Sequence, residues 1–117
     1  MSDCIFCKIV AGEIPSKKVF EDDLVYAFHD IHPLRPTHIL LIPKRHITSL
    51  AHVGVEDEPV LGRMLAVAHE IAAKNGSVDG FRAIINTGRI GGQEVPHLHL
   101  HIVGGGQPVG PMLTKVQ

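Results

Sequence analysis

Three histidines at alternate positions form the stretch of this sequence best suited to chemistry. His97, His99 and His101 lie in the run Pro96-His97-Leu98-His99-Leu100-His101-Ile102-Val103. Alternation is the period of a β-strand, whose successive side chains point to opposite faces. The spacing predicts a strand with its aliphatic residues in the core and three imidazoles on the other face, about 7 Å apart. Imidazole can ligate metals, transfer protons or act as a nucleophile, and the spacing leaves these roles open. The alternative is a half-buried strand whose polar face carries histidines without a function.

A second candidate site is the pair Cys4 and Cys7 in the segment Cys-Ile-Phe-Cys. A C-x-x-C pair can hold one metal ion with two thiolates, and zinc normally takes four tetrahedral ligands. His46 and one histidine of the predicted strand are the candidates for the other two ligands. The alternative is two reduced cysteines that simply pack on a short helix.

The loop before the histidines, Thr87 to Gln93, is rich in glycine. Glycines let a backbone come close to an anion and offer it N–H groups. Asn86 and Gln93 add amides that can hold phosphate or orient an imidazole. The loop lacks the G-K-[ST] end of a Walker motif and the dinucleotide fingerprint. Beside three histidines, it indicates a phosphorus-centred electrophile with imidazole as the nucleophile.

The elements that must position these residues predict an α+β fold. Apolar spacing predicts a short helix over 4–10 that stops before Gly12 and Pro15, and a long scaffold helix over Glu56–Asn75. Strands are predicted over Lys18–Phe20, Leu24–Phe28, Thr37–Ile42 and Phe81–Asn86, with a loop over Asp30–Pro36. In the third of these strands, His38 shares a face with Leu40 and Ile42, so we expect it to be shielded from water.

Bulk composition limits the classes of partner. The 117 residues are expected to form one domain, and 11 basic against 12 acidic residues give no electrostatic case for nucleic acid or an anionic membrane. No apolar run approaches the roughly 20 residues of a membrane span. Met1-Ser2-Asp3 starts without the basic and apolar regions of a signal peptide. The expectation is a soluble cytoplasmic protein.

The histidine run resembles the H-x-H-x-H-x-x signature of the histidine triad (HIT) family. The resemblance extends over nearly the whole chain and is closest to the bacterial type of the histidine triad nucleotide-binding branch. Its other matching segments are Cys4 to Pro15, Phe28-His29-Asp30-Ile31, Pro36-Thr37-His38, Ile42-Pro43-Lys44, Asn86, Gly92-Gln93-Glu94-Val95 and Gly110-Pro111-Met112.

This resemblance implies a HIT-like fold over residues 1–117, with an antiparallel sheet of about five strands, one long helix and a short N-terminal helix. It also implies hydrolysis of adenosine phosphoramidates to a nucleoside monophosphate through a nucleotidyl intermediate on His99. His38, His97 and His101 would orient or polarise the nucleophile and the phosphate. The resemblance also places Asp30 at the ribose hydroxyls and Phe6, Phe28 and Ile31 near the base. The other substrate-binding residues that it implies, in and beside the phosphate loop, are Asn86, Gly92, Gln93 and Glu94.

Members of the family that have this cysteine pair and a histidine like His46 resemble zinc-binding members. For this chain the resemblance implies a structural zinc on Cys4, Cys7, His46 and His97. No metal is required for attack by a neutral imidazole. Family members are usually homodimers, so a homodimer that binds a purine nucleotide such as AMP or GMP is expected.

The chain departs from its animal relatives at three places, since Glu94 replaces a serine, Pro96 an aromatic residue, and the tail lacks a tryptophan. Two other readings remain: a zinc-dependent hydrolase with the triad as ligands, and a non-catalytic nucleotide-binding or interaction protein with incidental hydrolase activity.

Overall fold

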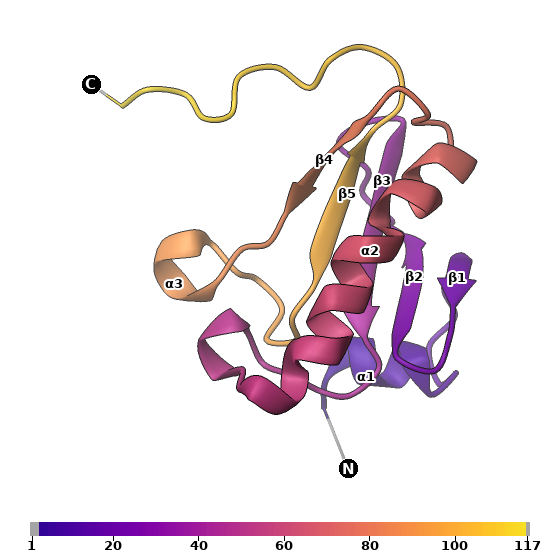
Figure 1. The fold of residues 1–117 in the computed structure, drawn as a ribbon, viewed down its shortest axis with the longest axis vertical. Helices are drawn as coiled ribbons and strands as arrows, with labels where there is room; N and C mark the ends of the chain where they lie inside the picture. The colour runs from indigo at the N-terminus through magenta and orange to yellow at the C-terminus, as the bar shows by residue number, and fades with distance from the viewer. Residues whose placement is uncertain (1–2, 117) are drawn as a thin grey trace.

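A five-stranded antiparallel sheet carries the molecule, with one long helix on one face and a short helix on the other (Figure 1). The computed structural model describes residues 3–116. Met1, Ser2 and Gln117 lie outside the described residues, and so does most of the Met1-Ser2-Asp3 segment on which the signal-peptide expectation rests. The strand order is β1-β2-β3-β5-β4. The helices and strands are α1 (Ile5–Val10), β1 (Lys18–Glu21), β2 (Val25–His29), β3 (Thr37–Pro43), α2 (Glu58–Lys74), β4 (Phe81–Ile84), α3 (Gly88–Gly91) and β5 (Leu100–Gly104).

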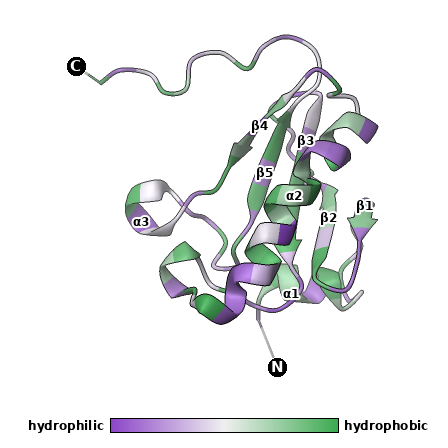
Figure 2. Cartoon of the chain, in the orientation of Figure 1, coloured by the Kyte–Doolittle hydropathy of each residue, from purple (hydrophilic) through white to green (hydrophobic). Residues whose placement is uncertain are grey.

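Side-chain alternation in β3 divides the core into two halves. All seven residues of β3 are buried. Ile39 and Leu41 pack with the apolar stripe of α2, while Leu40 and Ile42 pack with Phe6 of α1 on the opposite face. Figure 2 shows hydrophilic and hydrophobic residues following each other along α2, as expected for a helix with one buried face. His38 lies on the Leu40 face and is only 3% exposed, which confirms its predicted shielding.

The α+β class and the predicted elements are confirmed, with several shifted boundaries. The long helix begins at Glu58, because Val55–Asp57 forms a separate 3₁₀ turn in which the Gly54 N–H donates to Asp57 Oδ2. It ends at Lys74, before Gly76, whose φ of 98° places it in the left-handed region that favours glycine. Among residues 3–116, no helix combines the length and the apolar character that a membrane crossing requires.

The histidine strand is shorter than the sequence predicts. Regular pairing with β3 begins only at Leu100, so His101 lies in β5 while His97 and His99 precede it. The ladder cannot continue, because the Pro43 carbonyl accepts a hydrogen bond from the His97 side chain and the Leu98 N–H donates to Ile47 O. The prediction of one regular strand through all three histidines is therefore wrong. Leu98 still points into the core, as the alternation predicts.

The loop predicted over Thr87–Gln93 also differs, because it contains the short helix α3. The Gly91 N–H donates to Thr87 O, the Gly92 N–H to Arg89 O, and the Gln93 N–H to Gly88 O. β4 correspondingly ends at Ile84, two residues before the predicted end of that strand.

Candidate functional site

A cleft of about 470 Å³ lies between α1, the segment after β2 and the start of β5. It brings together most of the residues that the sequence places at a phosphate site. These are Phe6, Phe28, Asp30, Ile31, Asn86, Gly92, Glu94, His99 and His101. The sequence did not single out other lining residues, including Ile14, Pro15, Ser16 and Leu34, which no motif or polar pattern marks.

The hydrogen bonds of His99 assign its tautomer. Its Nδ1 lies 2.7 Å from the His97 backbone carbonyl, which can only accept, so Nδ1 carries a proton. A neutral ring then has its lone pair on Nε2. The ring is 6% exposed and lines the cleft, and the Phe6 ring packs edge-on against it at 5.2 Å between centroids. His99 thus lines the cleft in the tautomer that a nucleophilic imidazole requires.

A hydrogen-bond chain from the backbone assigns the tautomer of His101. The Leu34 N–H donates to His38 Nδ1 at 3.1 Å, so a neutral His38 carries its proton on Nε2. That Nε2–H donates to His101 Nδ1 at 3.0 Å. The remaining proton of a neutral His101 is therefore on Nε2. His101 lines the cleft beside His99, with 5.0 Å between ring centroids, and can donate this proton to a phosphoryl oxygen.

Burial keeps both members of this chain neutral. It lowers the pKa of His101 to about 4, and the neighbouring His99 and His38 act in the same direction. It also lowers the pKa of His38, against a smaller opposing effect of the Asp30 carboxylate 3.4 Å away. At neutral pH each ring is then one donor and one acceptor, as the chain requires.

Gln93 is placed differently from the sequence expectation. Its amide nitrogen donates to the carbonyls of Thr48 and Val95, and its amide oxygen accepts from the Gly88 N–H. This side chain ties α3 to the chain segments on either side of it. The N–H groups of Gly91, Gly92 and Gln93 donate within the loop, so the expected offer of these groups to an anion is not met. Asn86 and Gly92 do border the cleft.

No lysine or arginine is among the residues that line the cleft, whereas Asp30 and Glu94 are. The neutral hydrogen-bond donors that line the cleft include His101 and Asn86. The apolar side chains of Ile31 and Leu34 stand at its edge, 83% and 71% exposed.

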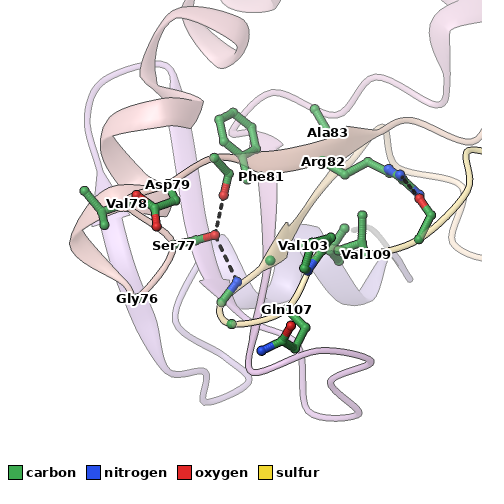
Figure 3. A pocket seen from close by; sticks show the side chains of 16 residues that line it. Gly76, Ser77, Val78, Asp79, Phe81, Arg82, Ala83, Val103, Gln107 and Val109 are labelled. Atoms are coloured by element: carbon green, nitrogen blue, oxygen red, sulfur yellow. Dashed lines mark hydrogen bonds between the residues drawn. The ribbon is translucent and has the colours of Figure 1, made fainter.

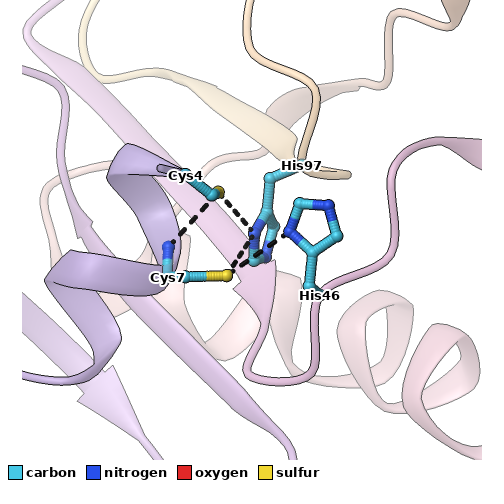
Figure 4. Close-up of side chains that lie close together, drawn as sticks. All are labelled: Cys4, Cys7, His46 and His97. Atoms are coloured by element: carbon cyan, nitrogen blue, oxygen red, sulfur yellow. Dashed lines mark hydrogen bonds between the residues drawn. The ribbon is translucent and has the colours of Figure 1, made fainter. Parts of the chain in front are cut away.

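A second cluster gathers Cys4, Cys7, His46 and His97, whose ligand atoms all lie within 4.8 Å of one another (Figure 4). Cys4 caps the N-terminus of α1, and Cys7 lies in its first turn. Arg45, next to His46, forms an ion pair with the buried carboxylate of Asp57 just before α2. The His97 ring is fully buried, and its Nε2 donates to the Pro43 carbonyl at 2.9 Å.

This donor set fits a metal ion. Since His97 Nε2 carries the proton, the lone pair of Nδ1 faces the sulfurs of Cys4 at 3.2 Å and Cys7 at 3.6 Å. His46 Nδ1 lies 3.4 Å from Cys7 Sγ. Zinc bonds in a tetrahedral site hold sulfur and nitrogen about 3.6 Å apart, close to these separations. A carbonyl that fixes the tautomer of a ligating histidine is also usual at metal sites.

The same test argues against a second group of ligand types, Asp30, His38 and His101. Coordination through His38 Nε2 needs the proton on Nδ1, where it would oppose the Leu34 N–H. The backbone therefore favours a hydrogen-bond chain for this group, and it leaves the cysteine cluster as the donor set that fits a metal ion. Neither backbone partner, Leu34 N–H nor Pro43 carbonyl, is visible in the sequence pattern.

A larger cavity, of about 870 Å³, lies at the far end of the sheet beside β4, the end of β5 and the C-terminal segment (Figure 3). Its polar groups are engaged in holding the chain. Ser77 Oγ donates to Gly80 O and accepts from the Gly105 N–H, and Arg82 donates to the carbonyls of Gly110 and Pro111. None of the residues predicted for the site lines this cavity.

Comparison with known proteins gives the family. The HIT domain model matches residues 11–107. The chain belongs to the HIT family. This HIT domain is 55% identical over 104 residues to protein HitA of Neisseria gonorrhoeae, covering 89% of this chain and 97% of that protein. It is 54% identical over 113 residues to the purine nucleoside phosphoramidase of Escherichia coli strain K12, covering 96% and 94%.

A solved structure agrees with the architecture of this HIT domain. The crystal structure of a HIT family hydrolase from Legionella pneumophila Philadelphia 1 matches with a TM-score of 0.85 and 47% identity, covering 90% of this chain and 95% of that one. The HIT-like fold expected from the sequence resemblance is confirmed.

Proposed function

We propose that this HIT domain is a nucleotidyl hydrolase that cleaves purine nucleoside phosphoramidates, with adenosine as the nucleoside, or related nucleotidyl conjugates, to a nucleoside monophosphate. The observation that carries the proposal is the state of His99, whose Nδ1–H is held by a carbonyl while Nε2 keeps its lone pair at the cleft. The E. coli relative named purine nucleoside phosphoramidase supports the substrate class.

In the first step, His99 Nε2 attacks the α-phosphorus, the P–N bond breaks, and the leaving nitrogen takes a proton from solvent to depart as the amine. Attack places positive charge on the imidazole, and the His97 carbonyl that accepts the Nδ1–H stabilises this charge. His101 Nε2–H donates to a phosphoryl oxygen as negative charge grows there. Water then attacks the nucleotidyl-His99 intermediate, which releases the nucleoside monophosphate and restores the ring.

The apolar end of the cleft suits a purine base. Phe6 and Phe28 pack edge-on at 5.6 Å between centroids, and the exposed Ile31 extends this surface. Burial of apolar side chains against a planar base is favourable. Asp30 follows Phe28 by two residues, and its carboxylate lies 3.4 Å from His38 Nε2, so we assign it to the ribose hydroxyls. We assign Asn86, Gly92 and Glu94, which also line the cleft, to the phosphate and leaving group. Gln93 has a positioning role through its three backbone contacts.

We further propose that the ion held by Cys4, Cys7, His46 and His97 is a structural zinc. Two sulfurs and two imidazole nitrogens are a donor set that zinc favours. Four protein ligands fill a tetrahedral shell, so the ion braces α1 against the segment that carries His97 and His99. Such a centre is compatible with the reducing environment of the cytoplasm, where we place the protein.

We also propose a homodimer as the working unit, since β4 is an edge of the sheet and edge strands need cover. The proposed partners are therefore a second copy and a purine nucleotide, with no role for nucleic acid or a membrane.

The test of this function is steady-state hydrolysis of adenosine 5′-phosphoramidate, with AMP binding measured separately by calorimetry. We expect turnover by the wild-type protein, loss of turnover by more than about 10³-fold in His99→Ala, and AMP affinity within about threefold of wild type. Binding of AMP without turnover by the wild-type protein would instead favour a nucleotide-binding protein. A loss in His99→Ala of only about 10²-fold would reduce His99 to acid–base help.

A further inference from the structure

We propose that Cys4 and Cys7 position the nucleophile His99, and that oxidation of this pair to a disulfide is a reversible switch that lowers turnover. The inference rests on the proposed function, because it concerns the rate of the step assigned to His99. It begins from the short distance, along bonds and contacts, between the cysteine cluster and the reacting ring.

The first connection between the two sites runs through His97. Its Nδ1 faces Cys4 Sγ at 3.2 Å and Cys7 Sγ at 3.6 Å, while its backbone carbonyl accepts the Nδ1–H of His99 at 2.7 Å. One residue therefore contacts the cysteines with its side chain and orients the nucleophile with its main chain. His97 lies outside the regular part of β5, so no ladder of sheet hydrogen bonds holds that carbonyl independently.

The second connection is Phe6, which lies between the two cysteines on α1. Its ring packs edge-on against His97 at 5.7 Å and against His99 at 5.2 Å between centroids. α1 has only six residues, and its contact with the His97 segment includes the cysteine cluster itself. A change in the position of Cys4 and Cys7 thus moves a ring that packs directly against the nucleophile.

The cysteine pair can close a disulfide without unfolding α1. Cys4 is the N-cap and Cys7 follows three residues later, a spacing that puts α-carbons about 5 Å apart in helical geometry. Disulfides bridge α-carbon separations of 4.4–6.8 Å. Both residues are partly exposed and the Cys7–His46 contact lies at the surface, so a small oxidant has access.

The reaction balances with a hydroperoxide as the oxidant. The two cysteines give up two electrons, one S–S bond forms, and hydrogen peroxide is reduced to two molecules of water. The two protons that this needs come from the thiols, or from solvent where the cysteines hold a metal ion as thiolates. Any metal ion held by the two sulfurs loses half of its protein ligands. His97 Nδ1 then lacks the sulfurs that it faces in the reduced protein, although its ring remains buried. Adjustment of His97 displaces the carbonyl that orients His99, and Phe6 moves with α1. Phe28 on β2, with Asp30 and Ile31 just after it, keeps the larger part of the base and ribose surface in place.

The experiment treats the purified protein, with the metal it retains, with hydrogen peroxide and then removes the peroxide with catalase. Disulfide formation is followed by peptide mass spectrometry, metal release by a zinc-sensitive dye, and the His99 imidazole by ¹⁵N NMR. We expect kcat for adenosine 5′-phosphoramidate to fall roughly 10- to 100-fold, with KM and AMP affinity within about threefold. Dithiothreitol with Zn²⁺ should restore kcat and the original His99 signals.

The matched control is Cys4→Ser with Cys7→Ser, which cannot form the disulfide. Without treatment it should show the reduced kcat of the oxidised wild type, and peroxide should not lower it further. Equal inactivation of this variant by peroxide, or unchanged kcat in a wild-type sample with the disulfide formed, overturns the proposal. If the double variant does not fold, Cys4→Ser alone serves the same comparison.

Failure of the proposed function gives a different pattern. A wild-type protein without turnover refutes the hydrolase, yet the switch is still read from the NMR signals of His99. Shifts of those signals that appear on disulfide formation and reverse with dithiothreitol support the coupling, and unshifted signals contradict it.

Discussion

The Leu34 N–H donates to His38 Nδ1 at 3.1 Å, and this contact decides where the protons of His38 and His101 lie. It places the His38 proton on Nε2, where it is donated to His101 Nδ1, and so leaves His101 with a proton for the cleft. It also makes His38 unsuited to hold a metal ion. The Leu34 N–H thereby distinguishes the hydrogen-bond chain of His38 and His101 from the proposed metal centre, which also contains two histidines.

This chain predicts a specific effect of replacing His38. In His38→Ala, His101 loses the donor that fixes its tautomer, so the Nε2–H is no longer held for the phosphoryl oxygen. We expect kcat to fall by about 10²-fold, the scale of lost general acid–base help. His38→Gln, whose longer side chain carries an amide N–H close to the position of histidine Nε2, can donate to His101 Nδ1 and should recover part of this loss. Steady-state kinetics of the two variants make the comparison, and equal kcat values for His38→Ala and the wild-type protein would contradict the chain.

The low pKa of His101 predicts how stability depends on pH. The folded pKa is about 4 and the unfolded value about 6.5, so between these values the unfolded chain binds more protons. The contribution of His101 is therefore complete above pH 6.5 and is lost as pH falls toward 4. We expect His101 to contribute about 1 kcal/mol per pH unit to the pH dependence of the free energy of urea unfolding in this window, after allowance for partial exposure. His101→Asn should flatten the slope, and an unchanged slope in this variant would contradict the assignment.

The metal centre predicts one zinc per chain. Elemental analysis of protein purified without a chelator should find close to this ratio, and Cys4→Ser with Cys7→Ser should lose the ion and lower the melting temperature. His52→Ala is a suitable control, because its ring contacts Ser49 outside the cluster. Zinc far below one per chain, or retention of zinc by the double variant, would contradict the zinc centre and leave His97 with a role at the phosphate site only.

The edge position of β4 predicts the oligomeric state. Light scattering at micromolar concentration should give twice the 12.7 kDa mass of one chain. A mass of 12.7 kDa across that range would show that the β4 edge remains uncovered in solution, and would refute the homodimer.

The sequence could predict those features that depend on local pattern. The apolar spacing of α2 and the division of β3 into two faces follow from side-chain periods, and both were predicted correctly. The chemical types of Cys4, Cys7 and His46 mark them as candidate ligands, the family resemblance adds His97, and the structure brings these four side chains together.

Features that depend on distant backbone groups could not be predicted in this way. The Pro43 carbonyl draws the His97 side chain out of the expected strand pattern, and the Leu34 N–H fixes the His38 tautomer. Gln93 has the amide group that the sequence analysis assigns to phosphate binding, yet this amide donates to the backbone carbonyls of Thr48 and Val95 instead. A side-chain type shows what a residue can do, but its partners depend on folding.

The most direct measurement of the central claim is a search for the covalent intermediate on His99. Wild-type protein is mixed with excess adenosine 5′-phosphoramidate, quenched within milliseconds and digested for peptide mass spectrometry under conditions that preserve phosphorus–nitrogen bonds. The account predicts an adenylyl group on His99 that decays at the rate of turnover and is absent in His99→Ala. Turnover in the wild-type protein with the adenylyl group on another residue would contradict nucleophilic catalysis by His99. Turnover with no adenylyl group on the protein at any sampled time would contradict it as well.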